Sequence, residues 1–161
     1  MGPGNELADE RSAISVRAMI PSDVTSLLSI LQESPEASLW TESGILEFAA
    51  LGMALVAEQN GAVAGFLIGR AAADEFEILN MAVARAWRRR GIAGLLVTEA
   101  LRRARTSGAR RAHLEVRASN RAAIGLYERH GFAPSGRRGE YYQHPPEDAL
   151  LFTVELRSAQ D

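Results

Sequence analysis

A run of arginines followed by small residues is the first pattern in this 161-residue chain that could carry chemistry. The segment 80–94, NMAVARAWRRRGIAG, joins an apolar stretch typical of a strand to a basic turn and a predicted helix start. Backbone N–H groups at a helix start are unpaired and the helix dipole favours anions there, so this turn could bind phosphate. Gly91, Ala93 and Gly94 would let a ligand approach the backbone closely. The alternative is a solvent-facing turn with an incidental arginine run.

Two side chains further along have the right chemistry to move protons. Glu115 lies in a predicted strand, and a carboxylate can accept a proton. Tyr127 lies in a predicted helix, and a phenol, with an ordinary pKa of about 10, can donate one. On the residues alone, Glu115 could equally be a solvent-facing charge, and the pattern favours Tyr127 as a core aromatic beside Ala123 and Ile124.

Two residue types are missing, and their absence excludes several kinds of chemistry. The chain has no cysteine, which excludes disulfides, thiolate metal sites and a cysteine nucleophile. It also has no lysine, which excludes a P-loop of the usual type and a Schiff-base enzyme. His113, His130 and His144 lack ligand-like spacing, so we expect no metal site.

Positive charge is concentrated in the middle of the chain. Residues 85–138 hold 14 arginines against three glutamates, whereas both flanking segments are acidic and the whole chain has a net charge of −2. Such a block indicates an anionic partner, either nucleic acid or a phosphorylated small molecule. Arg102, Arg103 and Arg105 have the spacing of a solvated helix face. Because Trp87 is the only aromatic residue within the arginine run, we expect no specific nucleic-acid binding.

The length and composition predict one globular domain, with 47% hydrophobic and 24% charged residues. The polar residues 1–13 are expected to form a flexible tail, and residues 14–157 the folded domain. The chain shows neither an apolar run long enough to span a bilayer nor a recognisable signal peptide, so we expect a cytoplasmic protein that does not bind membranes.

Apolar periodicity predicts an α/β domain with a mixed sheet and no internal repeat. Asn60-Gly61 between two alternating apolar runs predicts a β-hairpin. The expected strands cover residues 14–18, 55–58, 63–70, 75–83, 111–116 and 150–156. The expected helices cover residues 21–34, a short segment after Thr41, residues 91–107 with Gly108 as a stop, and residues 119–130.

Two motifs resemble those of a known family. Residues 88–93, RRRGIA, are similar to the Arg/Gln-x-x-Gly-x-Gly/Ala motif of the GNAT superfamily of N-acetyltransferases. Residues 114–132, LEVRASNRAAIGLYERHGF, closely resemble the RimI branch, the ribosomal-protein-alanine N-acetyltransferases. With the upstream ILNMAV, the resemblance covers most of residues 53–156. It implies the GNAT fold, an α/β (α+β) domain whose mostly antiparallel sheet is splayed at a bulged strand and has helices on both faces.

The resemblance implies an enzyme whose co-substrate is acetyl-CoA. The main chain of residues 81–83 would pair with the pantetheine arm, and residues 88–94 would hold the pyrophosphate. Asn80 interrupts an apolar face, which is compatible with a bulge that turns a backbone N–H toward the thioester carbonyl. The implied cofactor-binding residues are Met81, Ala82, Val83, Arg88, Arg89, Arg90, Gly91, Ile92, Ala93, Gly94 and Asn120. Asn120 is also a good helix N-cap for purely local reasons.

The resemblance also assigns catalytic roles and an acceptor. Glu115 would be the general base and Tyr127 the general acid of a direct acetyl transfer to the N-terminal α-amine of a protein, an alanine of a ribosomal protein. Trp40 and Tyr141 would border the acceptor, although Leu39 stands where the family usually has proline and Tyr141 could be an ordinary strand aromatic. Other hypotheses stay open: transfer to a lysine, a polyamine or an antibiotic, a non-catalytic acyl-CoA-binding module, and a nucleic-acid binder.

Overall fold

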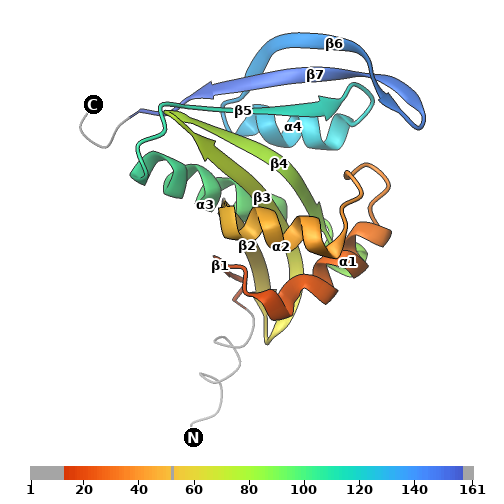
Figure 1. Ribbon diagram of the computed structural model, residues 1–161, viewed down its shortest axis with the longest axis vertical. Coiled ribbons are helices and arrows are strands. Elements are labelled where there is room, and N and C mark those ends of the chain that lie inside the picture. The colour runs from red at the N-terminus through yellow and green to blue at the C-terminus, as the bar shows by residue number, and fades with distance from the viewer. Residues whose placement is uncertain (1–12, 52, 158–161) are drawn as a thin grey trace, which may run out of the picture.

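A computed structural model describes residues 13–51 and 53–157, so the expected tail lies outside the described residues except for Ala13. The fold is a seven-stranded sheet with helices on both faces (Figure 1). The strands are β1 (Ser15–Ala18), β2 (Met53–Gln59), β3 (Ala62–Ala72), β4 (Glu75–Val83), β5 (Arg111–Arg117), β6 (Ala133–Gln143) and β7 (Pro146–Glu155). The helices are α1 (Val24–Gln32), α2 (Glu42–Leu51), α3 (Ile92–Thr106) and α4 (Arg121–Arg129), with single 3-10 turns at Pro21–Asp23 and Arg85–Trp87.

The strand order is β1-β2-β3-β4-β5-β7-β6, and every neighbouring pair is antiparallel except β4 and β5. The predicted mixed, mostly antiparallel sheet is therefore confirmed. The β2–β3 hairpin is also confirmed. Asn60 and Gly61 at its tip have φ angles of 52° and 80°, the left-handed conformations that a tight two-residue hairpin requires.

Each face of the sheet is covered by different helices (Figure 1). Leu55, Leu67 and Phe76 of the sheet are buried in one cluster with residues of α3 and α4. Val56 and Phe66 are buried in a second cluster with residues of α1 and α2. The sheet thus lies between two cores, and both of its faces must be apolar along the central strands.

β4 contains a bulge. Ile68 of β3 pairs with Asn80, but the next residue of β3, Gly69, pairs with Ile78, so Leu79 is an extra residue in β4. A bulge of this kind bends a strand and increases its twist. The interruption that Asn80 makes in the sequence pattern therefore does coincide with a bulge.

The bulge lies where β4 leaves β5. The parallel pairing of these two strands runs only from Glu75 to Ile78 on β4, and beyond that point the strands diverge (Figure 1). The extra residue also changes which side chains share a face. Ile78 and Met81 both pack on the α3 side, whereas Ala82 packs on the α1 and α2 side.

The strand β6 is not predicted by the sequence pattern, and β7 begins before the expected Leu150. Nearly every residue of β6 is exposed, so no apolar alternation marks it, and its sequence APSGRRGEYYQ contains proline and glycine, which strands normally disfavour. The segment is a strand because it pairs along β7 as the outermost member of the sheet, with register shifts after Pro134 and Arg138.

Candidate active site

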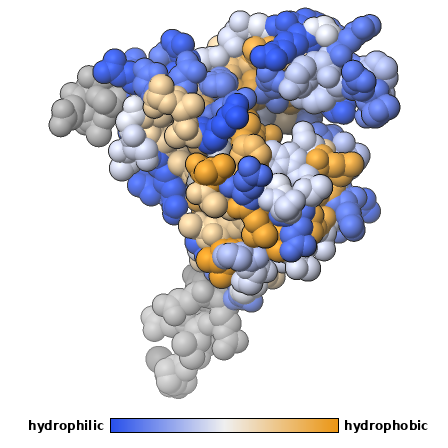
Figure 2. Space-filling view, viewed as in Figure 1, coloured by the Kyte–Doolittle hydropathy of each residue, from blue (hydrophilic) through white to orange (hydrophobic). Residues whose placement is uncertain are grey.

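A cleft of about 290 Å³ opens where β4 and β5 separate. It is bounded on one side by the second half of β5 and by α4, and on the other by β4 beyond the bulge and the segment between α1 and α2. Figure 2 shows the molecular surface hollowed between these two sides. The predicted site residues that line it are Met81, Ala82, Val83, Arg88, Glu115, Asn120 and Tyr127. The fold thus brings together residues from four separate stretches of the sequence.

The backbone of β4 turns hydrogen-bonding groups toward this cleft. Ala84, directly after β4, donates its N–H to the carbonyl of Ala64 on β3 at 2.8 Å. Because hydrogen-bonded pairs alternate along antiparallel strands, the backbone groups of Met81 and Val83 point away from β3. β5 no longer pairs with this part of β4. An extended ligand that carries amide groups can therefore bind along residues 81–83 as an additional strand does.

The start of α3 follows β4 and has an open backbone. Gly91 is the residue before the helix, with a φ of 76°, and no heavy atom lies within 4 Å of the position where a side chain would begin. The first N–H groups of this 15-residue helix carry the positive end of its dipole, so the turn suits a phosphate. Ile92 is buried in the core and offers only its backbone, whereas Ala93 and Gly94 are half-buried in the first helical turn.

The three predicted arginines have different surroundings. Arg88 donates from Nε to the carbonyl of Val83 at 3.1 Å and from Nη2 to the carbonyl of Glu33 at 2.8 Å, so it joins the end of β4 to the end of α1. Arg90 lies over the indole of the preceding 3-10 turn, 5.0 Å from the ring centroid. Arg89 is exposed beside it. Arg88 is therefore part of the cleft wall, and Arg89 and Arg90 lie at the surface near the start of α3.

Tyr127 projects from α4 and is 7% exposed. Its ring packs edge-on against Phe132, with the centroids 5.6 Å apart. Burial is the main cause that raises the pKa of Tyr127 well above its ordinary value. Within the described residues the hydroxyl has no hydrogen-bond partner but is not sealed inside the protein, because it opens onto the cleft. The phenol is thus kept protonated and available to a ligand.

Glu115 lies on the other face of the sheet. Its neighbours Leu114 and Val116 are buried on the α3 and α4 side, so its own side chain points to the opposite side, where it is 19% exposed. There the carboxylate contacts the guanidinium of Arg138, with Oε1 and Nε 3.1 Å apart. The base and acid candidates therefore line one cleft from opposite faces of the sheet, which is possible because the sheet is open between β4 and β5.

Asn120 is the N-cap of α4, as local reasoning predicts. Its Oδ1 accepts the N–H of Ala123 at 3.2 Å. The residue before it is also fixed, because Ser119 donates its backbone N–H and its hydroxyl to the carboxylate of Glu147 at 3.0 and 2.8 Å. The helix that carries Tyr127 is thus attached to β7 at its start.

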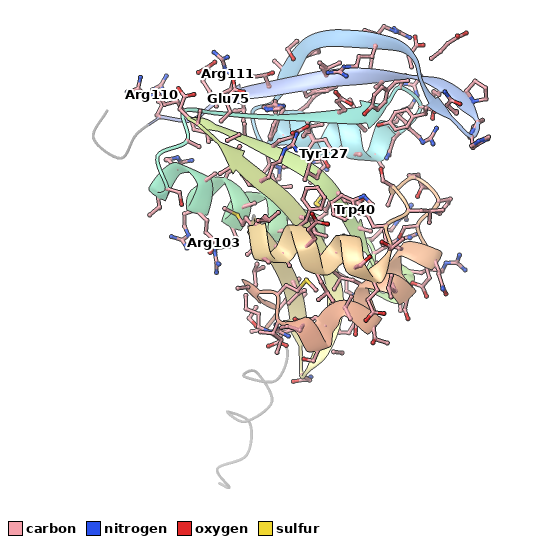
Figure 3. All side chains as sticks on the ribbon, in the orientation of Figure 1. Trp40, Glu75, Arg103, Arg110, Arg111 and Tyr127 are labelled. Carbon is pink, nitrogen blue, oxygen red and sulfur yellow. The ribbon has the colours of Figure 1, made fainter. Side chains whose placement is uncertain are left out.

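The two predicted acceptor residues do not line the cleft. Trp40 packs against Phe48, with ring centroids 4.7 Å apart, and is partly buried against the core cluster of α1 and α2 (Figure 3). Tyr141 is 47% exposed on β6 and packs edge-on against Tyr142. Tyr142, which follows it in the sequence, is the aromatic of this pair that reaches the cleft.

Asn80 is a functional candidate that sequence reasoning missed. It is 6% exposed and donates from Nδ2 to the carbonyl of Ser38 at 2.9 Å, which fixes the segment between α1 and α2 over the cleft. The signal was present, because an amide in the middle of an apolar strand needs a buried partner. On the sequence alone, the same signal predicts only a bulge.

Six of the 14 arginines in residues 85–138 form ion pairs with carboxylates of the described residues. Arg102 and Arg103 both contact Glu99, at 2.7 and 2.8 Å, so their interpretation as a helix face is confirmed. Arg111 contacts Glu75 and Glu155 at the end of the sheet, away from Trp40 and Tyr127 (Figure 3). The excess charge counted along the sequence is thus distributed over the surface.

In the part of the chain that the structure describes, no group of three or more histidine, aspartate or glutamate residues is arranged to hold a metal ion. In the same part, no helix has the length and apolar character needed to cross a membrane.

Comparisons with known proteins identify the family of this chain. Residues 24–132 match the model of the acetyltransferase (GNAT) family. Over 100 residues the chain is 36% identical to the ribosomal protein bS18-alanine N-acetyltransferase of Escherichia coli strain K12, covering 61% of this chain and 68% of that protein. The enzyme of the same name from Salmonella typhimurium is 36% identical over 96 residues, covering 58% of this chain and 65% of the relative.

Solved structures give the same result for the fold. The crystal structure of the ribosomal-protein-alanine N-acetyltransferase from Escherichia coli superposes with a TM-score of 0.82 at 28% identity, over 91% of this chain and 96% of that one. Ard1 from Thermoplasma volcanium superposes with a TM-score of 0.85 at 28% identity, over 91% and 99% of the two chains. The chain belongs to the acetyltransferase (GNAT) family and is an N-acetyltransferase that uses acetyl-CoA.

Proposed function

We propose that this enzyme acetylates the N-terminal α-amine of a protein, and that the acceptor is the N-terminal alanine of a ribosomal protein. The relatives at 36% identity are named for that activity. An α-amine has an ordinary pKa near 8, about two units below that of a lysine side chain, so a single carboxylate is a sufficient base.

The observation that carries the proposal is the position of Glu115 and Tyr127 on opposite faces of the open sheet, both at one cleft. A direct transfer needs a base on the side where the amine arrives and an acid on the side where the thiol leaves. The two faces supply these groups separately. The acceptor amine therefore approaches from the face that carries β6 side chains, and the thiol leaves toward α4.

The residues that would hold acetyl-CoA form a continuous path. The backbone of Met81 and Val83 pairs with the amides of the pantetheine arm, and the N–H groups after Gly91 bind the pyrophosphate. Arg89 and Arg90 lie beside that turn and add positive charge. Acetyl-CoA supplies the acetyl group already activated as a thioester.

Glu115 takes the proton of the acceptor ammonium, directly or through a water, so that the amine nitrogen can form its bond to the acetyl carbon. Backbone N–H groups of β4 beyond the bulge stabilise the negative charge that develops on the carbonyl oxygen. Tyr127 donates its proton to the sulfur as the carbon–sulfur bond breaks, the nitrogen releases its second proton to water as it becomes an amide, and the phenolate is reprotonated from solvent. Burial raises the pKa of this phenol, so it is in its protonated form when the sulfur leaves.

The proposal is tested with two matched peptides and acetyl-CoA. One peptide has a free N-terminal alanine and no lysine, and the other has a blocked N-terminus and one lysine. Mass spectrometry of the products should show an acetyl group on the α-amine of the first peptide only. Equal or faster modification of the lysine peptide, or transfer to neither while coenzyme A still binds, would reject the proposed acceptor and favour a small-molecule amine or a non-catalytic role.

A further inference from the structure

The carboxylate of Glu115 does not stand alone in the cleft. Arg138 of β6 forms an ion pair with it, with Nε and Oε1 3.1 Å apart. The two side chains differ in exposure, at 19% for Glu115 and 56% for Arg138, so the carboxylate lies inside and the guanidinium lies over it on the solvent side. An ion pair at this distance restrains the position of the carboxylate.

Arg138 reaches β5 across the strand between them. Ala149 of β7 is register-paired with Arg138 on one side and with Arg117 on the other, and it is fully buried. Glu115 is two residues before Arg117 and therefore lies on the same face of β5. Because residue 149 is alanine, its short side chain leaves room for Arg138 to reach across β7 to the carboxylate of Glu115.

A bulge in β6 begins directly after Arg138. The register moves from Arg138 opposite Ala149 to Tyr142 opposite Glu147, so β6 has extra residues between these pairs. Glu140 within the bulge has a φ of 50°, and its N–H donates to Oδ1 of Asp148 at 2.9 Å. The other oxygen of Asp148 accepts from Nε of Arg137 at 2.6 Å. One carboxylate of β7 thus fixes the bulge on both sides of Arg138.

Tyr141 completes the cluster around the carboxylate. The guanidinium of Arg138 lies 5.5 Å from the centroid of its ring. The negative charge of Glu115 is the main cause that raises the pKa of the Tyr141 phenol, and the charge of Arg138 opposes that shift. The phenol therefore reports on both charges without taking part in the reaction scheme proposed above.

We infer that Arg138 is a positioning residue, which holds the carboxylate of Glu115 in the orientation that receives the acceptor proton. This inference rests on the proposed function, because it requires Glu115 to be the base. The bulged β6 strand is then part of the catalytic apparatus, since the fixed bulge determines where the guanidinium lies. The role differs from substrate binding, because Arg138 acts through Glu115 and not on acetyl-CoA.

The test compares the variants Arg138→Gln and Arg138→Lys with a matched control. Arg70→Gln removes an arginine of similar exposure, 52%, from an ion pair with Glu77, whose contact is 2.8 Å long. With the free-alanine peptide we expect Arg138→Gln to lower kcat about tenfold at an unchanged KM for acetyl-CoA. Arg138→Lys should recover most of the rate, and Arg70→Gln should keep it. The unfolding temperature measures whether the variants remain folded.

The variant Glu115→Gln separates this inference from the proposed function. If Glu115 is the base and Arg138 acts through it, Arg138→Gln should cause no further loss in the Glu115→Gln background. A normal rate in Glu115→Gln would reject the proposed base, and the inference with it. A large loss in Glu115→Gln with a normal rate in Arg138→Gln would overturn only the positioning role.

A spectroscopic measurement tests the cluster without the reaction. Ultraviolet titration of the tyrosines, with Tyr141→Phe to identify the transition of Tyr141, should show that transition at higher pH in Arg138→Gln and at lower pH in Glu115→Gln. If Arg138→Gln leaves the transition where it is, the guanidinium does not lie at the carboxylate in solution and the inference fails, whatever acceptor the enzyme uses.

Discussion

Replacing Tyr127 with phenylalanine removes one hydroxyl and leaves the rest of the cleft wall in place. The ring is 7% exposed and packs on Phe132, and phenylalanine keeps both the volume and that contact. Because the hydroxyl has no hydrogen-bond partner within the described residues, its loss should change the free energy of unfolding by about 1 kcal/mol or less. The variant is therefore expected to fold and to bind acetyl-CoA as the parent does.

The effect on the rate should be much larger. A positioned general acid contributes roughly a hundredfold to ten-thousandfold, which corresponds to about 3 to 5.5 kcal/mol of activation free energy. We expect Tyr127→Phe to lower kcat by at least about a hundredfold and to leave the KM for acetyl-CoA nearly unchanged. Since burial keeps the phenol protonated, the parent enzyme should show no loss of rate from ionisation of Tyr127 below about pH 10.

The assay is simple for this chain. The protein has no cysteine, so a thiol reagent reports only the coenzyme A that is released. Binding of coenzyme A by calorimetry and the unfolding temperature serve as controls for the fold. A rate within about threefold of the parent, at unchanged coenzyme A binding, would show that Tyr127 is not the acid and that its raised pKa merely reflects burial.

Two further predictions concern stability. Asp23 is buried, accepts two hydrogen bonds from Arg17 at 2.8 and 2.9 Å and has a lowered pKa caused mainly by that arginine, so Asp23→Asn should cost about 2 kcal/mol at pH 7. Because the pKa of Asp23 is lower in the folded than in the unfolded protein, this stabilisation is complete above about pH 4 and is lost as the pH falls through the folded pKa. In urea unfolding, the free energies of unfolding of parent and variant should therefore converge in acid. A difference that stays constant with pH would contradict the assignment. Gly69→Ala would place a Cβ 2.8 Å from the carbonyl of Glu77 and closer still to the ring of Phe76. We expect the unfolding temperature to fall by about 5 °C or more. An unchanged unfolding temperature would show that the bulge can shift to make room.

The parts of the fold that were predictable are those in which neighbouring residues determine the local structure. Asn60-Gly61 specifies its hairpin, and Gly91 and Gly108 lie at the two ends of α3 with φ angles of 76° and 96°. The segment that would hold acetyl-CoA is of this kind. It needs only the end of one strand and the start of the next helix, which are consecutive in the chain, so its residues could be proposed together from their order.

The acceptor side could not be predicted in the same way, because it is assembled from distant segments by contacts that leave little pattern. Asn80 of β4 contacts Ser38, and Arg138 contacts Glu115 across β7. Trp40, chosen from a dipeptide, is partly buried against the core on the α1 and α2 side, and its place at the acceptor stays a prediction. Neither contact follows from periodicity, since an exposed arginine on a strand without apolar alternation looks like any other surface charge.

The exposure of β6 has a consequence for how the acceptor preference of this enzyme can change. Nearly all of its side chains are exposed, so substitutions there do not disturb either core, whereas Leu114 and Val116 on both sides of Glu115 are fixed by burial. Substitutions on β6 can therefore alter what surrounds the carboxylate while the carboxylate itself stays in place. Asp148 fixes the bulge through Arg137 and Glu140, on both sides of Arg138. The bulge thus determines where Arg138 and Tyr141 lie, so the effect of such substitutions is confined to this part of β6. The groups that would face the acceptor thus lie on an exposed edge strand, whereas the proposed acetyl-CoA site lies along β4 and the start of α3.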